Sequence, residues 1–174
     1  MRLSSAHAFS AWAEGTTQAN EVSVTPGLAH VCDIAVDVGP IRDLGPMPHG
    51  RRRIIPILGG TVGGPRLEAE IVAGGADWQY VRADGVVELV ARYSFLIRDD
   101  VEIAITNRGL RRASPEIMHR LSRGEPVDPA LVYFRTVPVF EAPAGPYAWL
   151  NESIFVATAA RLPDNVRITV FEVV

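Results

Sequence analysis

Acid–base chemistry requires an ionisable group in a partly buried place, and one segment of this chain supplies a candidate. Residues 74–85 read GGADWQYVRADG, so that Asp77 stands next to Trp78 between two turns marked by glycine. Partial burial raises the pKa of a carboxyl group and suits it to act as a general acid or base. We therefore predict that Asp77 is the catalytic residue of any reaction that this protein performs.

Four further residues combine with Asp77 into a candidate site. Side chains two positions apart in a strand share a face, and each of these residues lies on a mixed polar and aromatic face of a predicted strand: Tyr93, Arg135, Trp149 and Asn151. If these faces point into a barrel, the interior has the apolar walls and few convergent polar groups of a small-molecule pocket. We predict that the four residues bind the substrate, with Arg135 holding an anion or an enolate.

An alternative without catalysis stays open for the same residues. Large apolar residues occur on both faces of these strands, so the pattern does not decide which face points inward. Asp77 and Arg135 could instead form a buried ion pair that closes one end of the barrel. A cavity connected to solvent favours the enzyme, and direct contact in a packed core favours the ion pair.

The elements that must position these residues are short segments bounded by Gly, Pro or Asp. Alternating or continuous apolar patterns predict strands at 30–38, 51–58, 65–72, 77–82, 86–97, 101–107, 131–140, 149–159 and 166–173. Residues 39–50, with three prolines, are predicted as a loop. The sequence GGTVGGPR at 59–66 is predicted as a hairpin turn, since neither a lysine nor a helix follows the glycines as a phosphate loop requires.

One helix is predicted, and the strands decide the fold class. Ser114 is an N-cap residue followed by Pro115 and Glu116, which suit the first turn, and the helix is expected to end at Gly124. The short connections between successive strands favour antiparallel pairing. We predict an all-β fold, an antiparallel up-and-down barrel of about eight to ten strands with one short helix.

Length and composition limit the domain organisation and the partners. The 174 residues suit one domain, predicted at 28–174, with residues 1–27 as an N-terminal arm. A net charge of -3 gives no general attraction to nucleic acid or to an anionic membrane, and no apolar run approaches the roughly 20 residues of a membrane span. We expect no nucleic-acid partner and no membrane partner.

The residue types that are missing exclude several kinds of chemistry. All 17 basic residues are arginine, so a lysine Schiff base and a lysine general base are excluded. The single cysteine, Cys32, excludes an internal disulfide and any zinc or iron–sulfur site with several cysteines, and it fits a reducing compartment. We therefore expect a cytoplasmic protein that uses no metal and no other cofactor.

Four segments together carry a resemblance to a known family. They read GRRRIIPILGGTVGGPRLEAEIVAGGADWQYVRADGVVEL, ARYSFLIRDDVEIAITNRG, YFRT and YAWLNESIFVA. In this combination the chain resembles, over about residues 28–174, a family of small single-domain proteins known only as a domain of unknown function. The resemblance implies an up-and-down β-barrel, and it implies no catalytic residues.

Two functions remain open at this point. The first is a cofactor-independent enzyme that acts on a small, partly apolar or carboxylated molecule by proton transfer, isomerisation, cyclisation or hydrolysis. The second is a non-catalytic ligand-binding or oligomeric accessory protein. Leu150, Ile154 and Val156 lie on the strand face opposite Trp149, and an exposed apolar stripe there would need covering. On that basis we predict a homo-oligomer.

Overall fold

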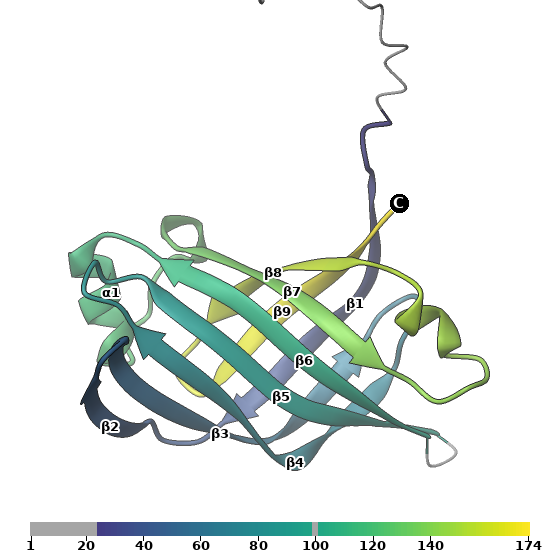
Figure 1. The fold of residues 1–174 in the computed structure, drawn as a ribbon, viewed down its shortest axis with the longest axis horizontal. Helices are drawn as coiled ribbons and strands as arrows, with labels where there is room; N and C mark the ends of the chain where they lie inside the picture. The colour runs from purple at the N-terminus through teal and green to yellow at the C-terminus, as the bar shows by residue number, and fades with distance from the viewer. Residues whose placement is uncertain (1–23, 99–100) are drawn as a thin grey trace, which may run out of the picture.

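The strands close into a barrel. The structure, a computed structural model, describes residues 24–98 and 101–174, and within them nine strands form one antiparallel sheet. The strands are β1 (Leu28–Val38), β2 (Arg42–Met47), β3 (Gly50–Gly63), β4 (Ala69–Val81), β5 (Val87–Ile97), β6 (Val101–Arg112), β7 (Tyr133–Glu141), β8 (Phe155–Arg161) and β9 (Asn165–Val173). Their order is β1-β9-β8-β7-β6-β5-β4-β3-β2, and β1 also pairs with β3, which closes the sheet and leaves β2 outside the ring (Figure 1).

The predicted fold class is therefore confirmed, and three short elements complete the structure. They are α1 (Pro115–Ser122) and the 3-10 helices η2 (Pro129–Leu131) and η3 (Ala148–Asn151). Of the predicted N-terminal arm, residues 1–23 lie outside the described residues. Among the residues that are described, no helix combines the length and the apolar character that a bilayer span needs.

Aromatic packing fills one half of the barrel. β7 alternates strictly between exposed and buried residues, and Phe134, Thr136, Pro138 and Phe140 point inward. Phe140 lies between Phe95 of β5 and Phe155 of β8, with ring centroids 6.1 and 5.0 Å apart. Aromatic side chains bury much apolar area, and edge contacts of this kind add to that stabilisation.

Glycines join two predicted strands into one. The strands predicted at 65–72 and 77–82 are one strand, β4, with a register shift between Val72 and Ala76. A Cβ atom at Gly75 would lie 2.6 Å from the Cβ atom of Tyr93, so only glycine fits in this bulge. The glycine pair at 74–75 therefore bends β4 and does not terminate it.

The predicted hairpin turn at 59–66 is also wrong in most of its length. β3 continues to Gly63, and its second half pairs with β1 from Asp33 to Asp37. Gly60 has φ +134°, and a Cβ atom there would collide with the carbonyl oxygen of Ala35. The residues that were expected to turn the chain are those that close the barrel.

The predicted loop at 39–50 contains a strand, β2. It pairs only with the beginning of β3, from Arg42 opposite Ile54 to Met47 opposite Gly50. Pro46 is tolerated because an edge strand leaves one side of its backbone without a ladder. Asp43 of β2 accepts a hydrogen bond of 2.7 Å from Arg51 of β3, which fastens the extension.

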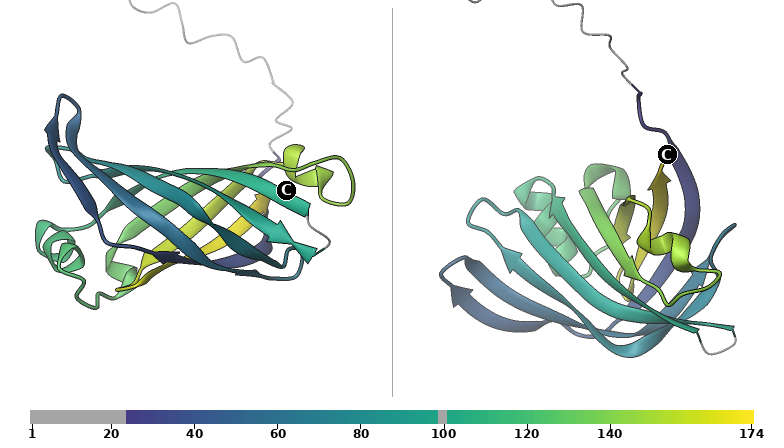
Figure 2. Two further views of the ribbon diagram at one scale, coloured as in Figure 1. Left: turned by 90° about the horizontal axis from the view of Figure 1, so that it is seen from below. Right: turned by 45° about the vertical axis from the view of Figure 1, so that its right-hand side comes forward.

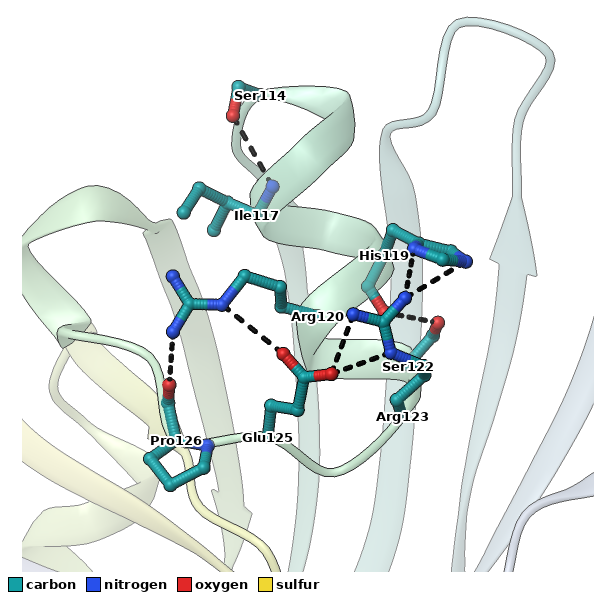
Figure 3. Close-up of polar contacts among 8 residues, drawn as sticks. All are labelled: Ser114, Ile117, His119, Arg120, Ser122, Arg123, Glu125 and Pro126. Atoms are coloured by element: carbon teal, nitrogen blue, oxygen red, sulfur yellow. Dashed lines mark hydrogen bonds and ion pairs between the residues drawn. The ribbon is translucent and has the colours of Figure 1, made fainter.

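The predicted helix is confirmed with its N-cap. The hydroxyl of Ser114 accepts a hydrogen bond from the backbone N–H of Ile117 at 3.4 Å (Figure 3). After the helix, Glu125 accepts hydrogen bonds from Arg120 at 3.3 Å and from Arg123 at 2.6 Å. The hydrogen bond from Arg123 is the main reason that the pKa of Glu125 lies below its usual range, and the bond from Arg120 lowers it further. Figures 1 and 2 place α1 at one end of the barrel and the segment between β7 and β8 at the other end.

The two faces of β5 give a direct test of the barrel core. Phe95 is fully buried, whereas its neighbour Leu96 is 40% exposed on the outer surface. We expect Phe95→Ala to lower the free energy of unfolding by about 3–5 kcal/mol, because it removes a buried ring and leaves a cavity. The control Leu96→Ala should change it by about 0.5 kcal/mol or less. Urea denaturation of both variants measures the difference, and equal losses would contradict the inward orientation of Phe95.

Candidate functional site

Strand register brings polar side chains together inside the barrel. Asp77 of β4 lies opposite Ala91 of β5, and Ala91 lies opposite Asn107 of β6. All three positions face inward. Since the residue between the two polar side chains is only an alanine, it leaves the space between them unfilled.

A second row of inward-facing residues, side by side across neighbouring strands, also has a small residue between polar ones. Gln79 of β4 lies opposite Leu89, Leu89 opposite Gly109, and Gly109 opposite Thr136 of β7. A Cβ atom at Gly109 would lie 3.0 Å from the Cα atom of Thr136, so this glycine also allows β6 and β7 to approach closely. Small residues in the middle of both rows thus create a cavity where a core would otherwise be packed.

The cavity is small and lined by both kinds of side chain. It has a volume of about 40 Å³, and apolar residues of β1, β3 and β9 form the wall across from the polar rows. A single water needs roughly 10–15 Å³ by this measure, so the cavity holds a few waters or a small functional group. Its polar lining residues are Asp77, Gln79, Tyr93, Asn107, Arg111, Thr136 and Arg161.

Most of these groups carry an atom that is buried without a hydrogen-bond partner. Within the described residues, this holds for Asp77 Oδ1, Gln79 Oε1, Tyr93 Oη, Asn107 Oδ1, Arg111 Nε and Thr136 Oγ1. Natural proteins satisfy the large majority of buried polar atoms, because each unpaired one costs about 1–3 kcal/mol. Six such atoms around one cavity indicate a site whose hydrogen bonds are completed by water or by a ligand.

Asp77 is held in a defined orientation in this site. The amide of Gln79 donates a hydrogen bond of 2.6 Å to its Oδ2 atom, while Oδ1 is buried and has no hydrogen-bond partner among the described residues. Burial raises the pKa of Asp77, and this effect outweighs the Gln79 hydrogen bond and the nearby charges of Arg111 and Arg161, which lower it. The carboxyl group therefore keeps its proton to a higher pH than an exposed aspartate does.

Two of the other ionisable groups of the cavity, Tyr93 and Arg111, have fixed states near neutral pH. Burial raises the pKa of Tyr93, so its phenol remains protonated and can donate a hydrogen bond. Burial lowers the pKa of Arg111 to about 10, so its guanidinium group remains charged. The cavity thus combines an acid–base group, a neutral donor and a cation, which together can move a proton and stabilise the anion that forms.

The structure brings together two of the five residues that the sequence singled out. Asp77 and Tyr93 both line the cavity. Arg135 instead lies on the outer face of β7, where its guanidinium group is 5.2 Å from the ring centroid of Tyr133 and donates a hydrogen bond of 2.9 Å to the carbonyl of Phe134. The alternative, an ion pair between Arg135 and Asp77, is ruled out, because Arg135 is on the exposed face of this strand while Asp77 is inside the barrel.

Trp149 and Asn151 lie at the opposite end of the barrel from α1. The strand predicted at 149–159 begins only at Phe155, and the two residues belong to η3. Asn151 exchanges two hydrogen bonds of 2.9 Å with the backbone of Ala142, which holds η3 against the end of β7. The ring of Trp149 packs on Phe155 and is covered by the guanidinium group of Arg66 at 3.7 Å.

The apolar stripe that suggested an oligomer is not continuous. Leu150 is 2% exposed and belongs to the core, whereas Ile154 is 69% exposed. The irregular backbone before β8 breaks the alternation that would have placed them on one face.

Five polar residues of the cavity lining were missed by the sequence analysis, and two of them, Asn107 and Arg111, had a visible signal. A third, Arg161, lies beyond the strand that was predicted at 149–159. The inward face of β6 reads Ile103, Ile105, Asn107, Gly109 and Arg111, an apolar face that becomes polar towards its end. The strand was predicted to stop at residue 107, which left Arg111 outside it. Gln79 and Thr136 share strands with Asp77 and Arg135 but carried no pattern that set them apart.

Comparisons with known proteins agree with the fold. The family described as "Protein of unknown function (DUF3237)" matches residues 26–173. A UPF0311 protein of Bradyrhizobium diazoefficiens is 43% identical over 152 residues, which cover 86% of this chain and 99% of that protein. A crystal structure of a conserved protein of unknown function from Rhodopseudomonas palustris is similar with a TM-score of 0.85 and 39% identity, covering 87% of this chain and all of that one.

A more distant structure shares the fold alone. It is described as an enzyme from Penicillium herquei and has a TM-score of 0.65 at 17% identity, covering 87% of this chain and 96% of that one.

The raised pKa of Asp77 makes stability depend on pH in a defined direction. Below its ordinary value of 3.8 the carboxyl is protonated in both states, and as the pH rises the unfolded chain ionises first. The free energy of unfolding of the wild type should therefore fall relative to that of Asp77→Asn as the pH rises above 3.8. Urea denaturation at a series of pH values measures this difference.

Asp84 is a control for which stability should change with pH in the opposite direction. It lies in the hairpin between β4 and β5, where a backbone hydrogen bond from Val86 lowers its pKa. The wild type should therefore gain stability relative to Asp84→Asn as the pH rises. A difference between the wild type and Asp77→Asn that does not change with pH would show that Asp77 is not desolvated.

Proposed function

The chain belongs to the DUF3237 family of proteins of unknown function, and from that premise we propose that its barrel binds a small, largely apolar molecule and catalyses a proton transfer on it without a cofactor. The observation that carries the proposal is the set of six unpartnered buried polar atoms around one cavity among the described residues. Packed cores do not keep such atoms unpaired, whereas binding sites present them to a ligand.

Asp77 is the group that moves the proton. Its ionised form takes a proton from an acidic C–H or O–H bond of the substrate at Oδ1, and the bonding electron pair stays on the substrate. Gln79 keeps Oδ2 engaged at 2.6 Å, so the exchange takes place at the other oxygen. Return of the proton to a different substrate atom completes an isomerisation with no net gain or loss of atoms.

Tyr93 and Arg111 stabilise the substrate anion that forms between these two steps. Tyr93 is 8% exposed and Arg111 is 8% exposed, so both act in a place from which most water is excluded. The neutral phenol donates a hydrogen bond, and the guanidinium group supplies a positive charge. In a medium of low dielectric constant such contacts stabilise a developing enolate more than they would in water.

Binding without catalysis is the second candidate. The same unpartnered atoms would orient a bound molecule even if no proton moved, and the small volume of the cavity supports a binder of small ligands. The likeness to a protein described as an enzyme does not decide between the two, because it concerns the fold alone.

Hydrogen–deuterium exchange tests the proton transfer without knowledge of the natural substrate. A panel of small enolisable ketones and keto acids is incubated with the protein in deuterated water, and exchange at the carbon next to the carbonyl is followed by NMR. We expect exchange of at least one compound to be accelerated, and Asp77→Asn to slow it by about 10²–10⁴-fold. The melting temperature should remain within a few degrees, because asparagine has the shape of the protonated acid.

Arg135→Gln is the matched control for this experiment. Because Arg135 lies on the outer face of β7, its replacement should leave the exchange rate unchanged. A loss of exchange in Arg135→Gln would support the assignment from sequence instead. Binding of the compounds without any acceleration would favour the non-catalytic function.

A further inference from the structure

A second pocket lies directly outside the inner cavity. It has a volume of about 260 Å³, and both residues of α1 and residues of the barrel strands line it. Ile55, Arg111 and Arg161 line both spaces, so the inner cavity and the second pocket lie next to each other, with these side chains between them. We call this space the outer pocket; its remaining lining includes Arg53, Arg123, Ile41, Met118 and Leu121.

The charged lining of the outer pocket is entirely basic. Of the residues that the structure describes, four arginines and no carboxylate contribute to it. Arg123 is neutralised, since it donates a hydrogen bond of 2.6 Å to Glu125 (Figure 3). The other three, Arg53, Arg111 and Arg161, come from β3, β6 and β8 and converge because the barrel is closed.

These three arginines are incompletely compensated. In the described part of the chain, the Nε atoms of Arg53 and Arg111 are buried and have no hydrogen-bond partner. Arg53 Nε is 3.7 Å from Asp43, but that carboxylate accepts a hydrogen bond of 2.7 Å from Arg51. Arg161 donates one hydrogen bond of 3.1 Å, to the carbonyl of Asn165.

Four arginines, at 51, 53, 111 and 161, stand against three acids, at 43, 77 and 164, so one positive charge is in excess when Asp77 is ionised and two when it is protonated. Asp43 is shared by Arg51 and Arg53, and Asp164 lies close enough to Arg161 to stabilise its charge. The remaining acid, Asp77, is the one whose pKa is raised by burial. Arg111 is thus a buried guanidinium group without a hydrogen-bonded carboxylate among the described residues, a state that proteins rarely keep unless an anion completes it.

We propose that the outer pocket binds the carboxylate of a small organic monoanion whose uncharged end enters the inner cavity. This inference rests on the proposed function and names its substrate class. The inner cavity of about 40 Å³ admits only a small functional group, whereas the outer pocket of about 260 Å³ admits the remainder of the molecule. Ile41, Met118 and Leu121 provide apolar contact for the hydrocarbon part.

A ligand that spans the two spaces is then bound in one orientation, with its carboxylate in the outer pocket and its reacting end in the inner cavity. Its carboxylate lies against Arg161 and Arg111, and its reacting end meets Asp77 and Tyr93. Arg111 lines both spaces and has five N–H donors, so it can donate to the carboxylate and also to the anion that forms at the reacting end. A planar carboxylate matches the paired donors of a guanidinium group, and a single negative charge matches the excess.

A pair of probe compounds that differ only in charge tests the inference. Binding of phenylacetate and of phenylacetamide is measured by calorimetry on the full chain. We expect the wild type to bind the carboxylate about tenfold or more tightly than the amide, since a hydrogen bond to a charged partner contributes about 1.5–3 kcal/mol. Arg161→Gln should remove most of that preference by weakening the carboxylate and not the amide.

Arg108→Gln is the matched control, because Arg108 lies on the exposed face of β6, three residues before Arg111. It should keep the full preference. Arg111→Gln is a second test at the buried position, with its melting curve recorded to show that the variant is folded.

The outcomes separate this inference from the proposed function. Equal binding of both probes, or a preference that Arg161→Gln and folded Arg111→Gln leave intact, would overturn the carboxylate site and leave the barrel as a binding site for neutral molecules. If neither probe binds but neutral ketones undergo exchange in the barrel, the carboxylate inference is overturned and the proposed function stands. If no compound binds or exchanges, both are overturned.

Discussion

The pairing of β1 with β3 is the contact on which the rest of this structure depends. It joins β1, at one end of the sheet, to β3 near the other end and turns the inward faces of the eight strands of the ring towards a common axis. The pairing uses the glycine-rich end of β3, where Gly60 has a backbone conformation that other residues rarely adopt and lies too close to Ala35 for a side chain. Without this closure, Asp77 and Arg161 would lie on distant strands of an open sheet, and no cavity would form between them.

Closure also explains why the interior is divided. Towards the η3 end, aromatic rings from β5, β7 and β8 interlock and exclude a ligand. Towards α1, Ala91 and Gly109 occupy inward positions where larger residues would fill the axis. The polar groups are concentrated where the packing is incomplete, and this coincidence distinguishes a site from a core with a few tolerated polar residues.

The two ends of the barrel differ in how their charges are satisfied. At the η3 end, Arg66 stacks on Trp149 and pairs with Glu172, which also accepts a hydrogen bond of 2.5 Å from Ser153. The hydrogen bond from Ser153 lowers the pKa of Glu172 the most, and the one from Arg66 lowers it further. The charges at this end are therefore satisfied by contacts among its own residues. At the α1 end, Arg53, Arg111 and Arg161 line open space instead. The difference indicates the end by which a ligand enters.

The sequence by itself determined the fold class and the helix with its cap, and it singled out two of the residues that line the cavity, Asp77 and Tyr93. The alternation in residues 86–97 placed Tyr93 with Leu89, Ala91 and Phe95, and the structure confirms that this face points inward. Such features follow from local periodicity and capping chemistry, which do not depend on distant residues.

Only the tertiary structure decided the remaining members of the site and the inward face of β7. Arg135 and Thr136 are adjacent, and large apolar residues stand on both faces of their strand, so the choice between them was made by the packing of Phe134 and Phe140 inside the closed ring. The same holds for Arg111 and Arg161, which are 50 residues apart and line one cavity because β6 and β8 both pair with β7. Periodicity records which residues share a face, whereas the contacts across the barrel determine where that face points.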